Sequence, residues 1–406
     1  MKDTIREERI IAAGVTRTIS DKTPGNLNTI LFGGTGSGKT TGYVCPNLNH
    51  PSGSFVVSDT KGILYNKYRQ SLANKGYDVI LIDLVNTGNS FGYNPLSYIR
   101  RHRDGSIMES DIKKLATLIV PISAPDDPFW SQSATRVISM YIGFVMEAMP
   151  PEKQNMNEVL KFHRAYTAGI ASDILEDFIF EHRDSYTARK YAMLSGMDKM
   201  EKTQRCIYEF VNESLDPFDC EEFASIFAAE TPVNIHQLGI KKTALFINSS
   251  DHDRSYHVLS SIINSQILQT LIDDADKNHN GELELPVTLY LDDFAAAAKI
   301  PDFDMTISII RSRNISVSIM LQSLSQLTHM YGKDSATTII NNCDTILYLG
   351  GGHDLETAEF ISSHINVTPH SVLNLPRDKA ILITSGEEPR RVDKIKATDE
   401  ITGLTA

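Results

Sequence analysis

Eight residues near the start of the chain have the types and spacing that bind phosphate. Residues 33–40 read GGTGSGKT, which matches the pattern G-x-x-x-x-G-K-[ST]. Its glycines let backbone N–H groups surround phosphate oxygens, and a helix that follows adds its positive N-terminal end. An apolar stretch at 28–32 predicts a strand before the loop, and 38–48 predicts a helix after it. The sequence therefore predicts a site for a nucleoside triphosphate, taken as ATP, with Mg²⁺.

Two side chains of the phosphate-binding loop have predicted roles of their own. Lys39 is expected to reach the β- and γ-phosphates, and the hydroxyl of Thr40 to bind Mg²⁺. We assign nucleotide binding to the whole loop and the residue after it: Gly33, Gly34, Thr35, Gly36, Ser37, Gly38, Lys39, Thr40 and Thr41.

A phosphate-binding loop also needs an acidic partner on a neighbouring strand. Residues 285–294 read LPVTLYLDDF, an apolar strand that ends in Asp292 and Asp293. In a parallel sheet these carboxylates emerge at the carboxyl edge, where ligands bind. Asp292 is expected to hold Mg²⁺ through water, and Asp293 to orient or activate the attacking water. The alternative is a solvent-exposed aspartate pair that caps the next segment.

Three further residues are candidates for catalysis. The apolar strand at 315–321 ends at Gln322, which is well placed to contact the γ-phosphate or the attacking water. The alternative is a glutamine that caps the following helix. Arg311 and Arg313 precede this strand, and an arginine donated across a subunit interface would stabilise transition-state charge. Surface salt bridges are the alternative for both arginines.

The elements that must position these residues predict an α/β fold, with a mostly parallel central sheet interrupted by an all-helical insertion. Strand-like runs alternate with helical runs before residue 100 and again after about 243, whereas 103–230 shows helical spacing almost throughout. We predict a nucleotide-binding domain in two parts, 1–102 and 231–406, with an all-α domain at 103–230. That insertion holds 13 Lys and Arg against 22 Asp and Glu.

Composition sets limits on the class of protein. The chain has 406 residues and a formal net charge of −12, which is not the charge of a simple DNA-binding domain. Its four cysteines make no CxxC pair and are expected to be buried free thiols. No run of 18 apolar residues predicts a membrane-spanning helix.

Several motifs in a fixed order resemble one family, the type IV coupling proteins, which are the TraG/TraD-like ATPases of bacterial conjugation and type IV secretion. The resemblance covers nearly the whole chain. It rests on GGTGSGKT (33–40), CPNL (45–48), SDTKG (58–62), YNPL (93–96), DDPFW (126–130), LDDF (291–294) and LQSLSQL (321–327).

This resemblance implies a RecA-like domain with an inserted all-α domain, assembled as a homo-hexamer at the cytoplasmic face of the bacterial plasma membrane. It implies ATP hydrolysis that couples a substrate to the type IV secretion channel. The usual substrate is a relaxase or relaxosome bound to single-stranded DNA, and sometimes a protein effector. The acidic insertion would then be a receptor surface for a basic substrate, or it would simply aid solubility.

The chain departs from the family pattern at three places. The family usually has N-terminal membrane helices, so we expect either a shortened chain or a member that docks on a separate membrane anchor protein. In isolation we expect a monomer, because membrane helices usually help members of the family to assemble. The usual D-P-K-G is Asp59-Thr60-Lys61-Gly62 here, and the usual Asp-Glu pair is Asp292-Asp293. Two other functions stay open: a RecA-like DNA pump or helicase unconnected with secretion, and a nucleotide-binding adaptor with little turnover.

Overall fold

The computed structural model describes residues 5–20, 25–120, 128–195, 201–229, 231–250, 255–295 and 299–396. The chain divides into two compact units. The first, called the sheet unit, comprises Met1–Leu81, Asn234–Asp251 and Ile267–Ala406, and the second, called the helical unit, comprises Ile82–Val233 and His252–Gln266. The boundaries predicted from the sequence, after residues 102 and 230, stay a prediction of how the chain is organised into domains. Asp126 and Asp127 of the DDPFW motif lie outside the described residues.

The sheet unit is built on a central sheet of nine strands in the order β11-β10-β9-β3-β8-β7-β4-β6-β5. Neighbouring strands from β9 to β6 in this order run parallel, whereas β10 is antiparallel to both β9 and β11. The mostly parallel sheet predicted from the sequence is confirmed. The strands are β3 (Thr29–Phe32), β4 (Ser54–Asp59), β5 (Asp78–Asp83), β6 (Thr243–Asn248), β7 (Val287–Leu291), β8 (Ile315–Leu321), β9 (Thr345–Tyr348), β10 (Lys379–Thr384) and β11 (Arg390–Asp393).

The strand order corrects one expectation. We predicted that the acidic strand neighbours the strand before the phosphate-binding loop, but β8 lies between β3 and β7 and is hydrogen-bonded to both. The carboxyl ends of all three strands still meet at one edge of the sheet, because the three strands are parallel.

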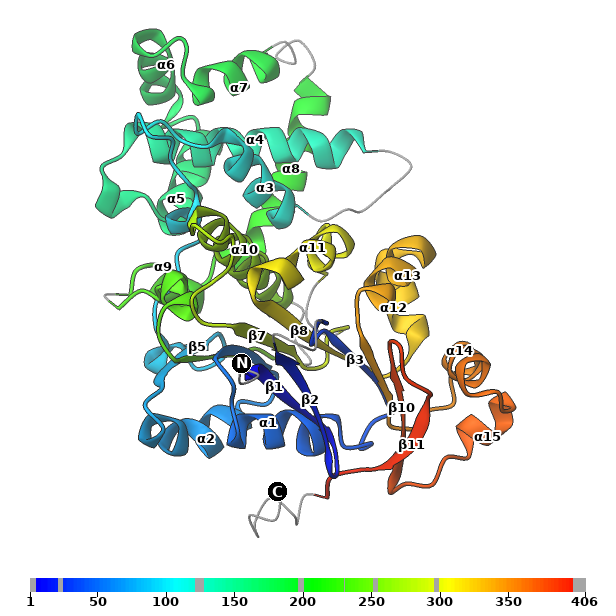
Figure 1. Cartoon of the computed structure of the whole chain (residues 1–406). Helices are drawn as coiled ribbons and strands as arrows, with labels where there is room; N and C mark the ends of the chain where they lie inside the picture. Colours follow the sequence, from blue (N-terminus) through cyan, green and yellow to red (C-terminus); the bar gives the residue numbers. More distant parts are fainter. Residues whose placement is uncertain are drawn as a thin grey trace. The chain divides into compact units, whose positions relative to one another are not determined.

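Helices cover both faces of the sheet, with α1 and α2 on one face and α11 to α13 on the other (Figure 1). Leu48 of α1 and Leu64 of α2 share a buried apolar core with Phe55 and Val57 of β4. The helical segments of this unit are η1 (Thr40–Val44), α1 (Cys45–Asn49), α2 (Ile63–Asn74), η6 (Ile235–Gly239), α10 (Ser255–Lys277, whose first part belongs to the helical unit), α11 (Phe303–Ile310), η7 (Arg311–Arg313), α12 (Leu324–Tyr331), α13 (Lys333–Asn341), α14 (Leu355–Ile365) and α15 (Pro369–Leu373).

An antiparallel hairpin of β1 (Ile5–Ala12) and β2 (Val15–Ser20) precedes the sheet, and the sequence did not predict it. It is fixed by Arg9, which is 1% exposed. The guanidinium of Arg9 lies 2.7 Å from the Glu7 carboxylate and donates to hydroxyls of Thr288 on β7 and Ser318 on β8. A charge is tolerated at such depth only when it is paired and hydrogen-bonded, and Arg9 meets both conditions.

The helical unit is organised around α4 (Phe129–Ala148), of which twelve residues are buried. This burial explains why a long apolar helix occurs here, and within the described ranges no helix is both long and apolar enough to cross a membrane. The other helical segments are η2 (Thr87–Asn89), η3 (Pro95–Tyr98), α3 (Glu109–Ile119), η4 (Pro151–Lys153), α5 (Met156–Thr167), α6 (Ser172–Glu181), α7 (Tyr186–Ser195), α8 (Glu201–Leu215), η5 (Asp216–Phe218) and α9 (Glu221–Phe227).

Candidate functional site

The phosphate-binding loop connects β3 to η1 and is held by backbone contacts from two neighbouring strands. Gly33 N–H donates to the Leu321 carbonyl at the end of β8, and Gly34 N–H donates to Gly350 after β9. A Cβ atom on Gly34 would come within 2.0 Å of the Gly351 carbonyl oxygen, so only glycine fits there. The loop therefore has a fixed backbone, as a phosphate site requires.

The loop presents donors to the carboxyl edge of the sheet. Gly38 has a φ of 97°, a conformation that favours glycine. In the described part of the chain, the backbone N–H groups of Gly36 and Gly38 donate to no protein acceptor. Turns of this kind form concave sites for anions, and the helix that begins next adds its positive end.

Lys39 lies within the loop that it serves. Its ammonium group donates to the carbonyls of Gly33 at 2.7 Å and Gly34 at 3.3 Å. Burial lowers the pKa of Lys39, while the nearby carboxylates of Asp293 and Asp292 act in the opposite direction. The side chain is thus a cation held close to the two acidic residues and aimed at the loop.

Asp292 and Thr40 meet in the structure, as the magnesium prediction requires. The Thr40 hydroxyl donates to Oδ2 of Asp292. The two residues follow β3 and β7, which are separated in the sheet by β8. Asp292 is 7% exposed. Burial raises the pKa of its carboxyl group, and the hydrogen bond from Thr40 opposes that rise. A carboxylate and a hydroxyl at one point supply the hard oxygen atoms that Mg²⁺ prefers.

Asp293 adopts an unusual backbone conformation. Its φ is 45°, and its N–H donates to Oδ1 of Asp292 at 3.0 Å. Asp and Asn are the residues other than glycine that most readily adopt a left-handed conformation. The turn directs the chain away from β7 immediately after Asp292, so that both carboxylates lie near Lys39.

Gln322 lies at the carboxyl end of β8, between the loop strand and the acidic strand. The residue is exposed, and its backbone N–H donates to the side-chain Oε1 of Gln326 at 3.0 Å. Ser323, not Gln322, caps α12, because its side chain accepts from the N–H of Gln326. The exposed Gln322 amide is consistent with its predicted role at the nucleotide, which stays a prediction.

Arg311 and Arg313 lie at the opposite edge of the sheet. They precede the amino end of β8, and the seven residues of that strand separate them from Gln322 by roughly 20 Å. Arg313 pairs with Asp276, at 2.8 Å. Neither arginine therefore reaches the phosphate-binding loop of its own chain, and donation to a second subunit stays a prediction.

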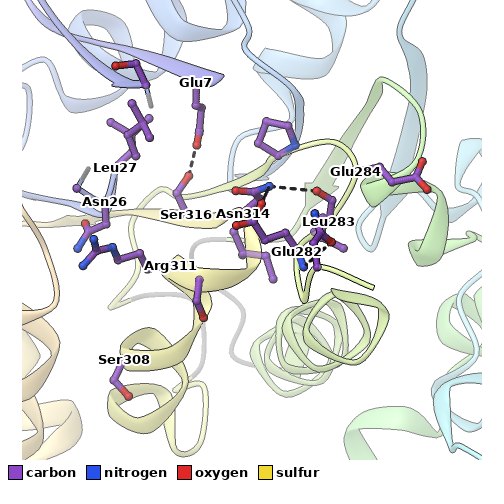
Figure 2. Close-up of a pocket in the computed structure, with 17 residues that line it drawn as sticks. Glu7, Asn26, Leu27, Glu282, Leu283, Glu284, Ser308, Arg311, Asn314 and Ser316 are labelled. Atoms are coloured by element: carbon purple, nitrogen blue, oxygen red, sulfur yellow. Dashed lines mark hydrogen bonds between the residues drawn. The ribbon is translucent and has the colours of Figure 1, made fainter. Parts of the chain in front are cut away.

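Arg311 instead lines the large cavity at this amino edge, of about 830 Å³ (Figure 2). Figure 2 shows Arg311 beside Asn26 and Leu27, across the cavity from Glu282 and Glu284. The cavity is far from Lys39 and Asp292, and it is not the nucleotide site.

The SDTKG motif has mainly a structural role. The Asp59 carboxylate accepts from the backbone N–H groups of Ile63, Leu64 and Tyr65 at the start of α2. Burial raises the pKa of Asp59, and these donors oppose the rise. Lys61 is close enough to Lys39 to lower its pKa slightly through repulsion between the two cations.

Sequence reasoning missed a second lysine at the loop. The ammonium group of Lys394, which follows β11, donates to the carbonyls of Ser37, at 3.1 Å, and Leu349. Burial lowers the pKa of Lys394. No sequence motif marks this residue, whereas the three glycines after β9, Gly350 to Gly352, were a visible signal of close backbone packing.

Comparisons with known proteins agree with this geometry. The family described as "Type IV secretory system Conjugative DNA transfer" matches residues 18–368. The conjugal transfer proteins TraG of Rhizobium radiobacter and of Agrobacterium fabrum are each 22% identical over 413 residues, which is 90% of this chain. The chain spans 61% and 60% of the length of these two relatives.

Solved structures show the same fold. The unbound bacterial conjugative coupling protein TrwBdeltaN70 has a TM-score of 0.71 at 15% identity, with 95% of this chain and 88% of that chain covered. The plasmid coupling protein TrwB in complex with ADP and Mg²⁺ has a TM-score of 0.70 at 16% identity, covering 97% and 94%. VirB4 of Thermoanaerobacter pseudethanolicus has a TM-score of 0.58 at 13% identity, covering 94% and 93%.

These structural likenesses confirm the predicted RecA-like P-loop fold. The family match confirms the resemblance based on the motifs, because it covers most of the chain and includes the phosphate-binding loop, Asp292 and Gln322. This chain belongs to the type IV secretory system family of conjugative DNA transfer proteins.

Proposed function

We propose that this chain is the ATP-hydrolysing part of a conjugative coupling protein. It recruits a relaxase bound to single-stranded DNA, or a protein effector, and couples that substrate to a type IV secretion channel at the inner face of the plasma membrane. Six copies form a ring in the working complex, anchored by membrane segments of the protein or by a separate membrane protein.

The observation that carries this proposal is the hydrogen bond between Thr40 and Asp292 beside Lys39. Residues far apart in the sequence meet at the end of the phosphate-binding loop in the arrangement that nucleoside triphosphatases use. The fold is that of TrwB, whose structures were determined with a non-hydrolysable ATP analogue and with ADP and Mg²⁺.

The residues present fit Mg²⁺ and ATP. The Thr40 hydroxyl and the Asp292 carboxylate would hold the cation, and the loop amides and Lys39 would hold the phosphates. When bound, Mg²⁺ supplies positive charge that neutralises the phosphate oxygens. When ATP binds, Lys39 would move from its carbonyl partners toward the β- and γ-phosphates, where its positive charge would also neutralise phosphate oxygens.

Asp293 then accepts the proton of the attacking water, as its position beside Asp292 allows. Gln322 orients that water from the end of β8 and senses the γ-phosphate. Hydrolysis forms a bond between the water oxygen and the γ-phosphorus and breaks the bond to the β,γ-bridging oxygen. An arginine from the next subunit, Arg311 or Arg313, completes the site in the ring.

Two other functions have less support. A chromosomal DNA pump would not need the large helical unit, which here has its own buried core around α4. A nucleotide-binding adaptor would not need an acidic residue after Asp292, whereas Asp293 is held there in a left-handed turn.

The proposal is tested with Lys39→Ala, measured against Lys333→Ala, an exposed lysine on α13 that is outside the site. We expect Lys39→Ala to lower ATP hydrolysis by about 10²-fold or more in the presence of single-stranded DNA, and to reduce conjugative transfer in a host that lacks the native gene. Lys333→Ala should match the unmodified chain. Equal hydrolysis by all three proteins would refute catalysis at this site.

A further inference from the structure

The helical unit contains a cavity of about 530 Å³ that the proposed function does not use. Residues of α3, α4 and α7 line it, together with the end residues Val120 and Pro128. Its size is in the range of small-ligand sites. Every residue of the lining belongs to the helical unit.

Three cations from three different helices line this cavity. Lys113 comes from α3, Arg136 from α4 and Lys190 from α7. In the part of the chain that the structure describes, no carboxylate lies within 4.0 Å of any of these three charges. The cavity wall also includes Gln132, whose amide group adds N–H donors.

Within the described residues, few Lys or Arg side chains of this unit form ion pairs. Residues 103–230 hold 22 acidic side chains and only 13 Lys and Arg, so this block is acidic overall. Arg189, directly beside Lys190, pairs with Glu109, and Arg164 pairs with Asp219. What distinguishes Lys113, Arg136 and Lys190 is their position: three cations that form no ion pair within the described residues line one cavity of an otherwise acidic unit.

The cations are close enough to affect one another. Burial lowers the pKa of Lys190, and the charges of Lys113 and Arg136 lower it further, against the opposing effect of Glu109. The Lys190 ammonium also lies over the Tyr186 ring, 4.8 Å from its centroid, which fixes it near the cavity. Mutual repulsion of this kind is relieved when an anion binds between the cations.

We propose that this cavity binds phosphate groups, carried by a free di- or triphosphate or by the backbone of a single-stranded nucleic acid. The planar fork of Arg136 matches two phosphate oxygens, and Lys113 and Lys190 add point charges from the facing helices. Gln132 supplies a neutral donor. The site is distinct from the phosphate-binding loop, and its existence does not depend on ATP hydrolysis by the chain.

The experiment uses the full chain with Lys39→Ala, so that the phosphate-binding loop is weakened in every sample. Inorganic tripolyphosphate is titrated by calorimetry, and a labelled oligothymidylate by fluorescence anisotropy. The test variant is Lys113→Gln with Lys190→Gln. The matched control is Lys114→Gln, which removes the same charge from the neighbouring, exposed position on α3 and does not line the cavity.

We expect the double variant to weaken tripolyphosphate binding by about tenfold or more and Lys114→Gln by less than about twofold. Arg136→Lys, which keeps the charge but loses the fork, should give an intermediate loss. If only the oligothymidylate is affected in this pattern, the proposal holds with a nucleic-acid backbone as the source. Equal affinities in all variants, or no binding of either probe while far-UV circular dichroism shows an intact fold, would overturn it.

Discussion

Replacing Asp293 with Asn should stop ATP hydrolysis and leave the fold and ATP binding intact. Asp293 has a φ of 45°, and Asn tolerates that conformation as well as Asp does. The two side chains have nearly the same size, and the N–H of residue 293 can still donate to Asp292. The substitution therefore removes the proton acceptor with little change to the backbone.

The size of the effect follows from the proposed role. Loss of a general base typically lowers the rate by about 10²- to 10⁴-fold, so the Asn variant should keep at most ~1% of the activity. The Asp293 carboxylate also lies near Lys39, where it opposes the burial that lowers the pKa of the lysine. Removing this negative charge from the phosphate site should leave the affinity for ATP unchanged or slightly higher.

The assay is steady-state phosphate release with single-stranded DNA, beside equilibrium binding of a fluorescent ATP analogue. Asp302→Asn is the matched control, because Asp302 is another left-handed aspartate, with a φ of 51°, at the start of α11. It should hydrolyse ATP normally. If Asp293→Asn retains more than about a tenth of the rate with normal binding, Asp293 is not the base.

Asp293→Glu separates backbone strain from chemistry, because glutamate keeps a carboxylate but is less suited to a left-handed turn. We expect the free energy of unfolding to fall by about 1–2 kcal/mol while hydrolysis is retained. A variant as stable as the parent in urea would show that the turn relaxes easily and that the positive φ of residue 293 does not strain a glutamate.

Two further predictions concern residues outside the motif. Arg9→Met leaves Glu7 charged and buried, so it should lower the free energy of unfolding by about 3–5 kcal/mol in urea melts. The control, Arg17→Met, breaks a more exposed pair with Glu387 and should lower it by less than about 1 kcal/mol. Similar losses for both variants would contradict the role of burial. Lys394→Met removes the donor to Ser37 and should weaken binding of the ATP analogue by about tenfold. The control, Lys379→Met, loses a surface pair with Asp393 and should leave the affinity for the analogue unchanged. Equal affinities of the two variants would show that Lys394 does not support the loop.

The sequence predicted the central sheet well because most of its strands are parallel. All five residues of β7 are buried, as are all four of β3 and of β9, and strands buried on both faces appear as nearly continuous apolar runs. The β1–β2 hairpin escaped prediction for the opposite reason. Its first strand, IREERIIA, is rich in charge, and the burial of Arg9 depends on hydroxyls of β7 and β8 that are far away in the sequence.

The candidate site also contains residues that the sequence revealed and one that it did not. Lys39, Thr40 and Asp292 could be found because each belongs to a short linear pattern with a known geometric purpose. Lys394 belongs to no pattern. It reaches Ser37 only because β11 is the antiparallel neighbour of β10, which extends the sheet beyond β9. An edge strand of four residues, three of them charged, gives a weak signal in sequence.

Strand order was the step that the sequence left open, and it decides how the site works. A hydrogen bond from Thr40 to Asp292 passes over the end of β8, since β8 lies between the two strands that lead to these residues. The end of β8 therefore lies between the strand that leads to the loop and the strand that leads to the acidic pair, and the exposed Gln322 follows it there. We therefore expect a nucleotide held by Lys39 and Asp292 to lie near Gln322, and we propose this residue as the link between the nucleotide and α12, the helix that begins two residues later.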